Sequence, residues 1–272
     1  MKVLVLGDVF GEAGRNAVVE KLPILKARYK PNFIIVNAEN ATHGRVVSAK
    51  HAKEIFRAGA NVITLGDKVW DYQADIDYFK SQKNIVRPFN LDSEKLNEDI
   101  KIFNIGSKKI AVLSFLGKTF METERRKMTS PYKKMDKILE ELVLGKDADA
   151  IIVDFHAEAS SEKLCFAFKY DGKISAVYGT HTHIPTADKR ILKDGTGYIT
   201  DIGMCGVQNS AIGMDVEAGI QFMQKNYGDI DKRIFAHPSK AEAGELSGVV
   251  FEIDDSTGKT INIEQILPKS FK

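Results

Sequence analysis

Cysteine is scarce in this sequence of 272 residues, and long hydrophobic runs are missing. The two cysteines, Cys165 and Cys205, lie far apart and form no Cys-x-x-Cys pair, which excludes a disulfide framework and favours a reducing compartment. No apolar run approaches the length of a transmembrane helix. The apolar run that begins near Met1 is too short for a signal peptide and predicts a buried strand. We therefore expect a cytoplasmic protein.

A strong excess of charge of either sign is also missing. The chain has 39 lysines and arginines against 37 acidic residues, a formal net charge of +2. This balance favours neither a membrane partner nor sequence-specific binding of nucleic acid, so a nucleotide would be held by a local site. Internal repeats and low-complexity linkers are absent too, which favours a single domain over residues 1–272.

Short β-branched runs alternate with helical stretches along the chain. Val3–Leu6, Phe33–Val36 and Val62–Leu65 are continuous apolar runs, typical of strands buried on both faces. Arg15–Arg28 and Ser48–Arg57 between them predict helices, so this part of the chain predicts a parallel sheet with right-handed crossovers.

The second half predicts further strands and helices. A helix is expected to begin at Ser130-Pro131 and end near Leu144, because serine caps a helix and proline suits its first turn. The other predicted elements are the hairpin Ile100–Ile105 with Ile110–Leu116, the strands Ala150–Val153 and Ile174–Tyr178 with a helix over Ser160–Phe168 between them, and a C-terminal hairpin of Leu246–Ile253 with Thr260–Leu267.

Polar residues of the kind that bind metals follow five of these strands. They are Asp8, Glu39 with Asn40, Asp67, His156, and His181 with His183. Because ligands of an open α/β sheet bind beyond the carboxyl ends of its strands, we expect all seven side chains at one sheet edge. Extended residues at i and i+2 point to the same side, so both His181 and His183 can face the cluster. Carboxylate, amide and imidazole donors in this number suit two divalent ions.

Each residue also has a structural interpretation when it is taken alone. Asp8 could cap the helix that follows, Glu39-Asn40 could form an ordinary polar loop, and His181-Thr182-His183 could be a hydrogen-bonded turn. The glycines of Gly7–Gly14 also resemble a dinucleotide loop, with Glu39 in the place of a ribose-binding acid. Two features count against that alternative. Asp8 would place a carboxylate beside the negatively charged pyrophosphate, and the chain has no Tyr-x-x-x-Lys catalytic pair.

Several short motifs occur along the chain, namely Gly7-Asp8, Asn37–Asn40, Trp70-Asp71, Asp154–Ala159, Gly179–His183 and Thr200–Gly206. Together they resemble the YmdB-type branch of the calcineurin-like metallophosphoesterases, and the resemblance covers essentially the whole chain. The resemblance implies a four-layer α/β/β/α sandwich with mixed sheets. It also implies a cytosolic homo-oligomer that uses two metal ions, iron or manganese, to hydrolyse phosphodiesters, including cyclic nucleotides such as 2′,3′-cyclic or 3′,5′-cyclic AMP.

The family pattern also implies how the ligands divide between the two ions. Glu39 would bridge them. Asp8, Asn40 and His183 would complete one site, and Asp67, His156 and His181 the other.

The chain departs from the family after the third strand. The family usually reads Gly-Asn-His there, with the histidine as proton donor, whereas this chain reads Gly66-Asp67-Lys68. An unperturbed lysine has a pKa of about 10.4 and donates a proton less readily than histidine near neutral pH. Lys68 could instead stabilise the oxygen of the leaving group by its charge.

The loop after Asn40 departs from the glycine-rich family pattern as well. His43 could enter the pocket as a substitute acid or face solvent as a loop histidine, and Arg45 could hold a phosphate oxygen. We therefore predict a phosphodiesterase in which a metal-bound hydroxide attacks phosphorus and Lys68 assists the leaving group. The alternative is a metal-binding sensor with weak or no catalysis.

Overall fold

A computed structural model of the chain describes residues 1–69, 76–91, 99–122, 127–230, 237–240 and 243–268. Within these ranges the strands form two six-stranded sheets and one two-stranded sheet, with parallel and antiparallel neighbours. The predicted mixed α/β class is confirmed. None of the described helices has the length and hydropathy needed to cross a membrane.

The first sheet contains the N-terminal strands. Its spatial order is β14 (Thr260–Ile266), β13 (Gly248–Ile253), β1 (Lys2–Leu6), β3 (Phe33–Asn37), β4 (Val62–Thr64) and β5 (Ile85–Val86). Strands β1, β3 and β4 are parallel, as predicted, and β5 is parallel to β4. Strand β13 pairs antiparallel with β1. Strands β13 and β14 form the predicted C-terminal hairpin.

The second sheet contains the strands from the middle of the chain. Its order is β10 (Arg190–Ile191), β11 (Gly197–Ile199), β9 (Ala176–Thr180), β8 (Ala150–His156), β7 (Lys108–Leu116) and β6 (Lys101–Ile105). The predicted hairpin of β6 and β7 is confirmed. A separate parallel pair joins β2 (Asp8–Val9) to β12 (Met204–Cys205).

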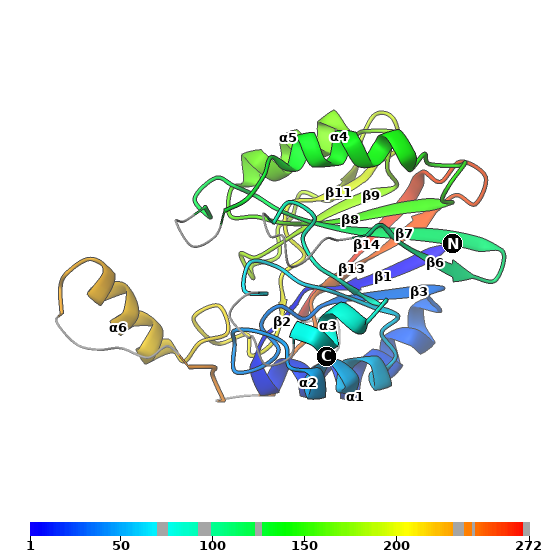
Figure 1. The fold of residues 1–272 in the computed structure, drawn as a ribbon. Helices are drawn as coiled ribbons and strands as arrows, with labels where there is room; N and C mark the ends of the chain where they lie inside the picture. The colour runs from blue at the N-terminus through cyan, green and yellow to red at the C-terminus, as the bar shows by residue number, and fades with distance from the viewer. Residues whose placement is uncertain (70–75, 92–98, 123–126, 231–236, 241–242, 269–272) are drawn as a thin grey trace.

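Helices lie on the outer side of each sheet (Figure 1). Those beside the first sheet are α1 (Gly11–Tyr29), α2 (Ala49–Ala58) and α3 (Ile76–Ser81), and those beside the second are α4 (Pro131–Glu141) and α5 (Ser160–Lys169). Ser130 caps α4 as predicted, because its hydroxyl accepts a hydrogen bond from Lys133 N at 3.3 Å. Helix α6 (Val216–Asn226) was not among the predicted helices, and it projects away from both sheets (Figure 1).

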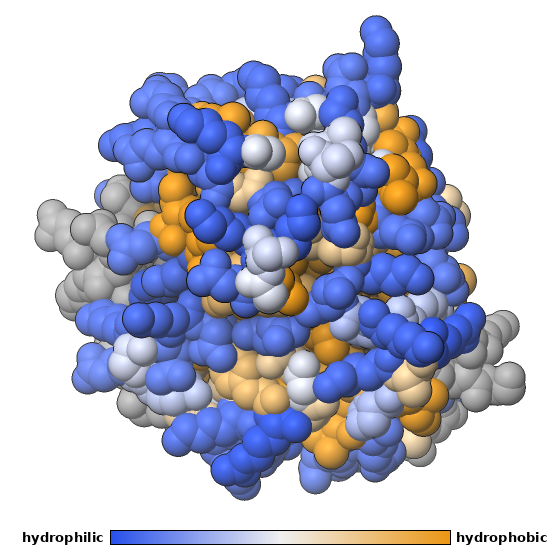
Figure 2. Space-filling model, turned by 90° about the vertical axis from the view of Figure 1, so that its right-hand side faces the viewer, coloured by the Kyte–Doolittle hydropathy of each residue, from blue (hydrophilic) through white to orange (hydrophobic). Residues whose placement is uncertain are grey.

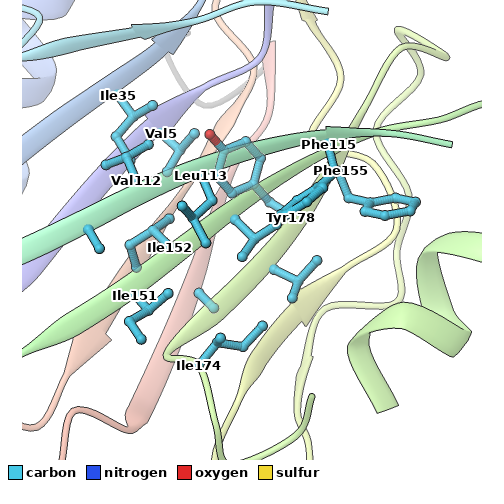
Figure 3. Packing of buried hydrophobic residues seen from close by; sticks show 14 of the residues in the cluster. Val5, Ile35, Val112, Leu113, Phe115, Ile151, Ile152, Phe155, Ile174 and Tyr178 are labelled. Atoms are coloured by element: carbon cyan, nitrogen blue, oxygen red, sulfur yellow. The ribbon is translucent and has the colours of Figure 1, made fainter. Parts of the chain in front are cut away.

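A hydrophobic core fills the space between the two sheets. Val5 and Ile35 of the first sheet and Val112 and Ile152 of the second belong to one buried hydrophobic cluster (Figure 3). Neighbouring residues of β1, such as Leu4, point to the opposite face and pack with α1 and α2. The continuous apolar runs are thus explained by burial on both faces, and each such side chain contributes about 1.5–3 kcal/mol.

The outer surface on the side away from α6 is mostly hydrophilic (Figure 2). Hydrophobic side chains show there in separate areas between charged and polar ones (Figure 2). This distribution is the usual one for a face in contact with water.

Candidate active site

The seven predicted metal ligands meet where the two large sheets face one another. Asp8 lies in β2, Glu39 and Asn40 follow β3, Asp67 follows β4, His156 ends β8, and His181 and His183 follow β9. The expectation of a single sheet edge was wrong, because β8 pairs with β7, β9 pairs with β8, and all three belong to the second sheet. The cluster therefore joins the ends of two sheets.

Three of the ligands form a compact group, called here the Asp67 group. It consists of Asp67, His156 and His181, whose ligand atoms all lie within 4.8 Å of one another. His156 Nε2 is 3.4 Å from Asp67 Oδ1 and 3.1 Å from His181 Nδ1. A carboxylate and two imidazoles at this spacing suit a divalent transition metal.

Asp8, Asn40 and His183 form the second group, called here the Asp8 group. His183 Nε2 is 3.1 Å from Asn40 Nδ2 and 4.0 Å from Asp8 Oδ1. Asp8 does not cap α1, since Phe10 is at the N-cap, and its Oδ2 accepts a hydrogen bond from His181 N at 3.0 Å.

Glu39 is the sequence neighbour of Asn40 in the Asp8 group, and its carboxylate is held by the backbone beside Asp67, after β4. Its carboxylate accepts hydrogen bonds from Gly66 N and Lys68 N, each at 2.6 Å. Burial raises the pKa of Glu39 to about 7, with Lys68 lowering it and Asp67 also raising it. Its contacts beside Asp67 and its sequence neighbour Asn40 in the Asp8 group make Glu39 the candidate for a bridging ligand.

Hydrogen bonds behind the cluster orient two of its histidines. His156 Nδ1 is 2.9 Å from Thr180 Oγ1, which donates to Asp154 Oδ1 at 2.6 Å. His183 Nδ1 is 2.7 Å from the carbonyl of Ile212. Each contact assigns the Nδ1 proton outward and leaves Nε2 to face the cluster, as in many metal-binding histidines.

Asp154 also connects the two sheets, a role that the sequence pattern did not indicate. Asn37 and Thr64 of the first sheet donate to its Oδ2 at 2.9 and 2.6 Å. Burial raises the pKa of Asp154, although His156 and these donors oppose the shift. The signal available in the sequence was a carboxylate at the end of an otherwise apolar strand.

The His181–His183 segment is a turn and not an extended strand. Strand β9 ends at Thr180, and both histidines have positive φ, 98° for His181 and 67° for His183. The expectation of i and i+2 strand geometry was therefore wrong, although both imidazoles reach the cluster. Left-handed backbone at a non-glycine residue is strained and persists only when its surroundings fix it.

A buried ion pair between Lys163 and Asp201 contacts the backbone of this turn and stabilises it. Lys163 Nζ donates to Asp201 Oδ2 and to the carbonyl of Thr180, both at 2.9 Å. Asp201 Oδ2 also accepts from the hydroxyl and the amide of Thr182, at 2.8 and 3.2 Å. Lys163 and Asp201 have no exposed surface. Asp201 belongs to one of the family-like motifs, whereas Lys163 gave no signal in the sequence.

The cluster contains three buried carboxylates, Asp8, Glu39 and Asp67, to which a cation could bind. Asp8 Oδ1 is buried and has no hydrogen-bond partner among the described residues. Burial lowers the pKa of His156, but the hydrogen bond with Asp67 and the charges of Asp8 and Glu39 outweigh it and raise the value to about 9. Burial and His156 lower the pKa of His181 to about 3. The donors and their charge therefore fit divalent metal ions.

A cavity of about 420 Å³ opens onto the cluster. His43, Arg45 and Lys68, the three predicted catalytic and substrate-binding residues, all line it together with His181 and His183. His43 is exposed in a turn with φ 56°, so it lies at the rim of the cavity. Trp70-Asp71 of the family motif lies outside the described residues.

The apolar wall of this cavity gave no recognisable signal in the sequence. It is formed by Phe10 and by residues near and on α6, namely Ile212, Met214, Phe222 and Pro238. The backbone that leads to α6 is held where Asp215 N donates to the carbonyl of His237 and Ser239 N to that of Gly213, at 2.9 and 2.8 Å. A wall of this kind can hold the apolar part of a ligand.

Known proteins are similar to this chain over almost its whole length. Residues 4–266 match the model of the YmdB-like protein family. The chain is 40% identical over 267 residues to the 2′,3′-cyclic-nucleotide 2′-phosphodiesterase of Bacillus subtilis (strain 168), and the match covers 98% of this chain and 97% of that protein.

Two solved structures are also similar along their whole lengths. A novel phosphatase from Mycoplasma pneumoniae is 38% identical, with a TM-score of 0.89 over 98% of this chain and 92% of that one. A hypothetical protein from Thermus thermophilus is 30% identical, with a TM-score of 0.86 over 98% of both chains. With sequence, fold and motifs in agreement, the chain belongs to the YmdB-like protein family.

Proposed function

We propose that the chain is a metal-dependent phosphodiesterase, a hydrolase whose substrates include cyclic nucleotides. The observation that carries the proposal is a buried cluster of carboxylates and imidazoles that opens into a cavity lined by cationic side chains. The names of the related proteins, a cyclic-nucleotide phosphodiesterase and a phosphatase, support phosphoester hydrolysis. 2′,3′-Cyclic and 3′,5′-cyclic AMP are the substrates to test first.

Two divalent ions, iron or manganese, would bind in this cluster. Glu39 would contact both, the Asp67 group would hold one and the Asp8 group the other. When bound, such ions supply an activated water and neutralise the charge on the phosphoryl group.

Residues that line the cavity would bind the ester and assist the leaving group. Arg45 is exposed there and carries planar donors that suit two phosphate oxygens. The Lys68 side chain is 25% exposed, so its ammonium can reach both the cluster and the cavity. We propose that it stabilises the leaving oxygen and that His43 at the rim is a secondary proton donor.

The remaining expectations are part of the same proposal. The two sheets and their outer helices would form the four-layer α/β/β/α sandwich within a single domain over residues 1–272, and the chain would act as a cytoplasmic homo-oligomer.

The experiment is to load the protein with Mn²⁺ or Fe²⁺, determine its metal content, and measure hydrolysis of bis-p-nitrophenyl phosphate and 2′,3′-cyclic AMP. We expect turnover of both, with a disproportionate preference for the activated ester, because p-nitrophenolate leaves without a proton. Lys68→His should narrow that preference. Asp8→Asn should abolish turnover, and Asp194→Asn on the surface should not. Bound metal with turnover of neither compound would favour a metal-binding sensor.

A further inference from the structure

The ammonium of Lys68 lies among oxygen atoms that belong to the proposed metal ligands. Its Nζ donates to Asn40 Oδ1 at 2.6 Å. It is also 4.0 Å from Glu39 Oε1 and 4.0 Å from Asp67 Oδ1. All three ligand side chains are buried. A positive charge of the protein itself is thus placed within the cluster.

The backbone explains why this lysine reaches inward. Lys68 N donates to the same Glu39 oxygen, Oε1, from which its Nζ is 4.0 Å. The residue is therefore held at its backbone and at the tip of its side chain by neighbouring atoms. Because its amide and its ammonium are both held, the Lys68 side chain loses little further conformational entropy when the ammonium binds Asn40.

The contacts of Lys68 fall unevenly on the two ligand groups. Asn40, a member of the Asp8 group, has both ends of its amide engaged, Oδ1 by Lys68 and Nδ2 by His183 Nε2. In the Asp67 group, Lys68 Nζ approaches the Asp67 carboxylate at 4.0 Å, which is longer than a hydrogen bond. The ligand atoms of that group remain within 4.8 Å of one another.

We infer that Lys68 is an internal competitor for one of the two metal positions. An ion in the Asp67 group would bind tightly. An ion in the Asp8 group would have to displace the ammonium from Asn40, because two cations this close repel one another and both need the same oxygen. The inference rests on the proposed metal centre and is independent of the proposed hydrolysis.

An anion in the cavity should favour replacement of the Lys68 ammonium by a metal ion at the Asp8 group. The displaced ammonium would move into the cavity that Lys68 lines, where Arg45 already places a positive charge. A phosphate group in the cavity would neutralise both, so phosphate and the second ion should strengthen each other's binding.

The test is calorimetric titration of the metal-free, full-length protein with Mn²⁺, together with metal analysis and the EPR spectrum of the bound ions. Wild type should bind one ion tightly and a second at least about tenfold more weakly. Lys68→Met should bind two ions of similar affinity and show the spectrum of a coupled manganese pair. Inorganic phosphate should strengthen the second site in wild type and have a much smaller effect in Lys68→Met.

The matched control is Lys108→Met, since Lys108 has a similar exposed fraction, 31%, and contacts Asp149, which belongs to neither ligand group. It should titrate like wild type. Lys68→Gln is a second variant, and circular dichroism checks that each variant is folded. Two ions of equal affinity in wild type, or an unchanged second affinity in Lys68→Met and Lys68→Gln, would overturn the inference. Because no substrate is present, the number and affinity of the bound ions can be interpreted even if hydrolysis is never observed.

Discussion

The ion pair beneath the histidine turn offers the most direct test of what holds the site in place. We consider Lys163→Met, which keeps most of the side-chain stem, and Asp201→Asn, which keeps the shape but removes the charge. Each change leaves the other charge buried, and both residues have no exposed surface. Removal of one partner of a buried pair costs about 3–5 kcal/mol.

The double variant measures the interaction energy between Lys163 and Asp201 apart from their contacts with other residues. Lys163→Met with Asp201→Asn leaves no unpaired charge, so its loss of stability should be smaller than the sum of the single losses by about 2 kcal/mol. The new amide oxygen would still accept hydrogen bonds from Thr182, whose amide and hydroxyl lie 3.2 and 2.8 Å from Asp201 Oδ2 in the wild type. The single variants should also bind Mn²⁺ more weakly, because the turn carries His181 and His183.

Urea unfolding followed by circular dichroism at neutral pH measures the four free energies of this cycle. The control is the exposed pair Lys169–Asp136, with side chains 42% and 52% exposed, whose removal should cost less than about 1 kcal/mol. Additive losses in the double variant, or single losses as small as those of the control, would refute the reasoning.

Two further predictions concern His156. In the metal-free protein its pKa is raised from 6.5 to about 9, so the stability from its proton is fully present below pH 6.5 and is lost as the pH rises through 9. Metal binding needs the neutral imidazole, so the increase in melting temperature caused by Mn²⁺ should grow over this window, and a constant increase would contradict the assignment. Separately, a Cβ at Gly66 would lie 2.5 Å from His156 Nε2, so Gly66→Ala should weaken Mn²⁺ binding about tenfold or more in a titration. Gly206→Ala, whose nearest contact is 3.5 Å, should bind normally, and equal affinities in the two variants would show that the imidazole can move aside.

Local signals were sufficient to predict most strands and helices. The apolar runs of β1 and β3 and the Ser130-Pro131 start of α4 depend on neighbours in sequence, so they are visible before the fold is known. Helix α6 was not predicted, although Val216, Ile220 and Met223 recur at the helical spacing i, i+4 and i+7. In the structure these three side chains are exposed, so the stripe does not face the core between the sheets.

The gathering of the candidate ligands was predictable from the sequence, and the geometry of the cluster was less so. Strand ends indicated where Asp8, Glu39 and the histidines gather, but the division into two sheets depends on which strands pair. The turn at His181 depends on Lys163, a helical residue whose contact with Asp201 exists only in the folded chain. Side chains that act by supporting others leave little signal in a single sequence.

The placement of α6 has a consequence for how this enzyme scaffold can diverge. The ligands depend on the two sheets, whereas Phe222 and Met214 of the cavity wall come from an excursion that projects away from them (Figure 1). Changes in the length or composition of this excursion would reshape the cavity without disturbing the core. If the cavity holds the substrate as proposed, the residues of its apolar wall and the residues of the core lie in separate stretches of the chain, so selectivity could change while selection preserves stability.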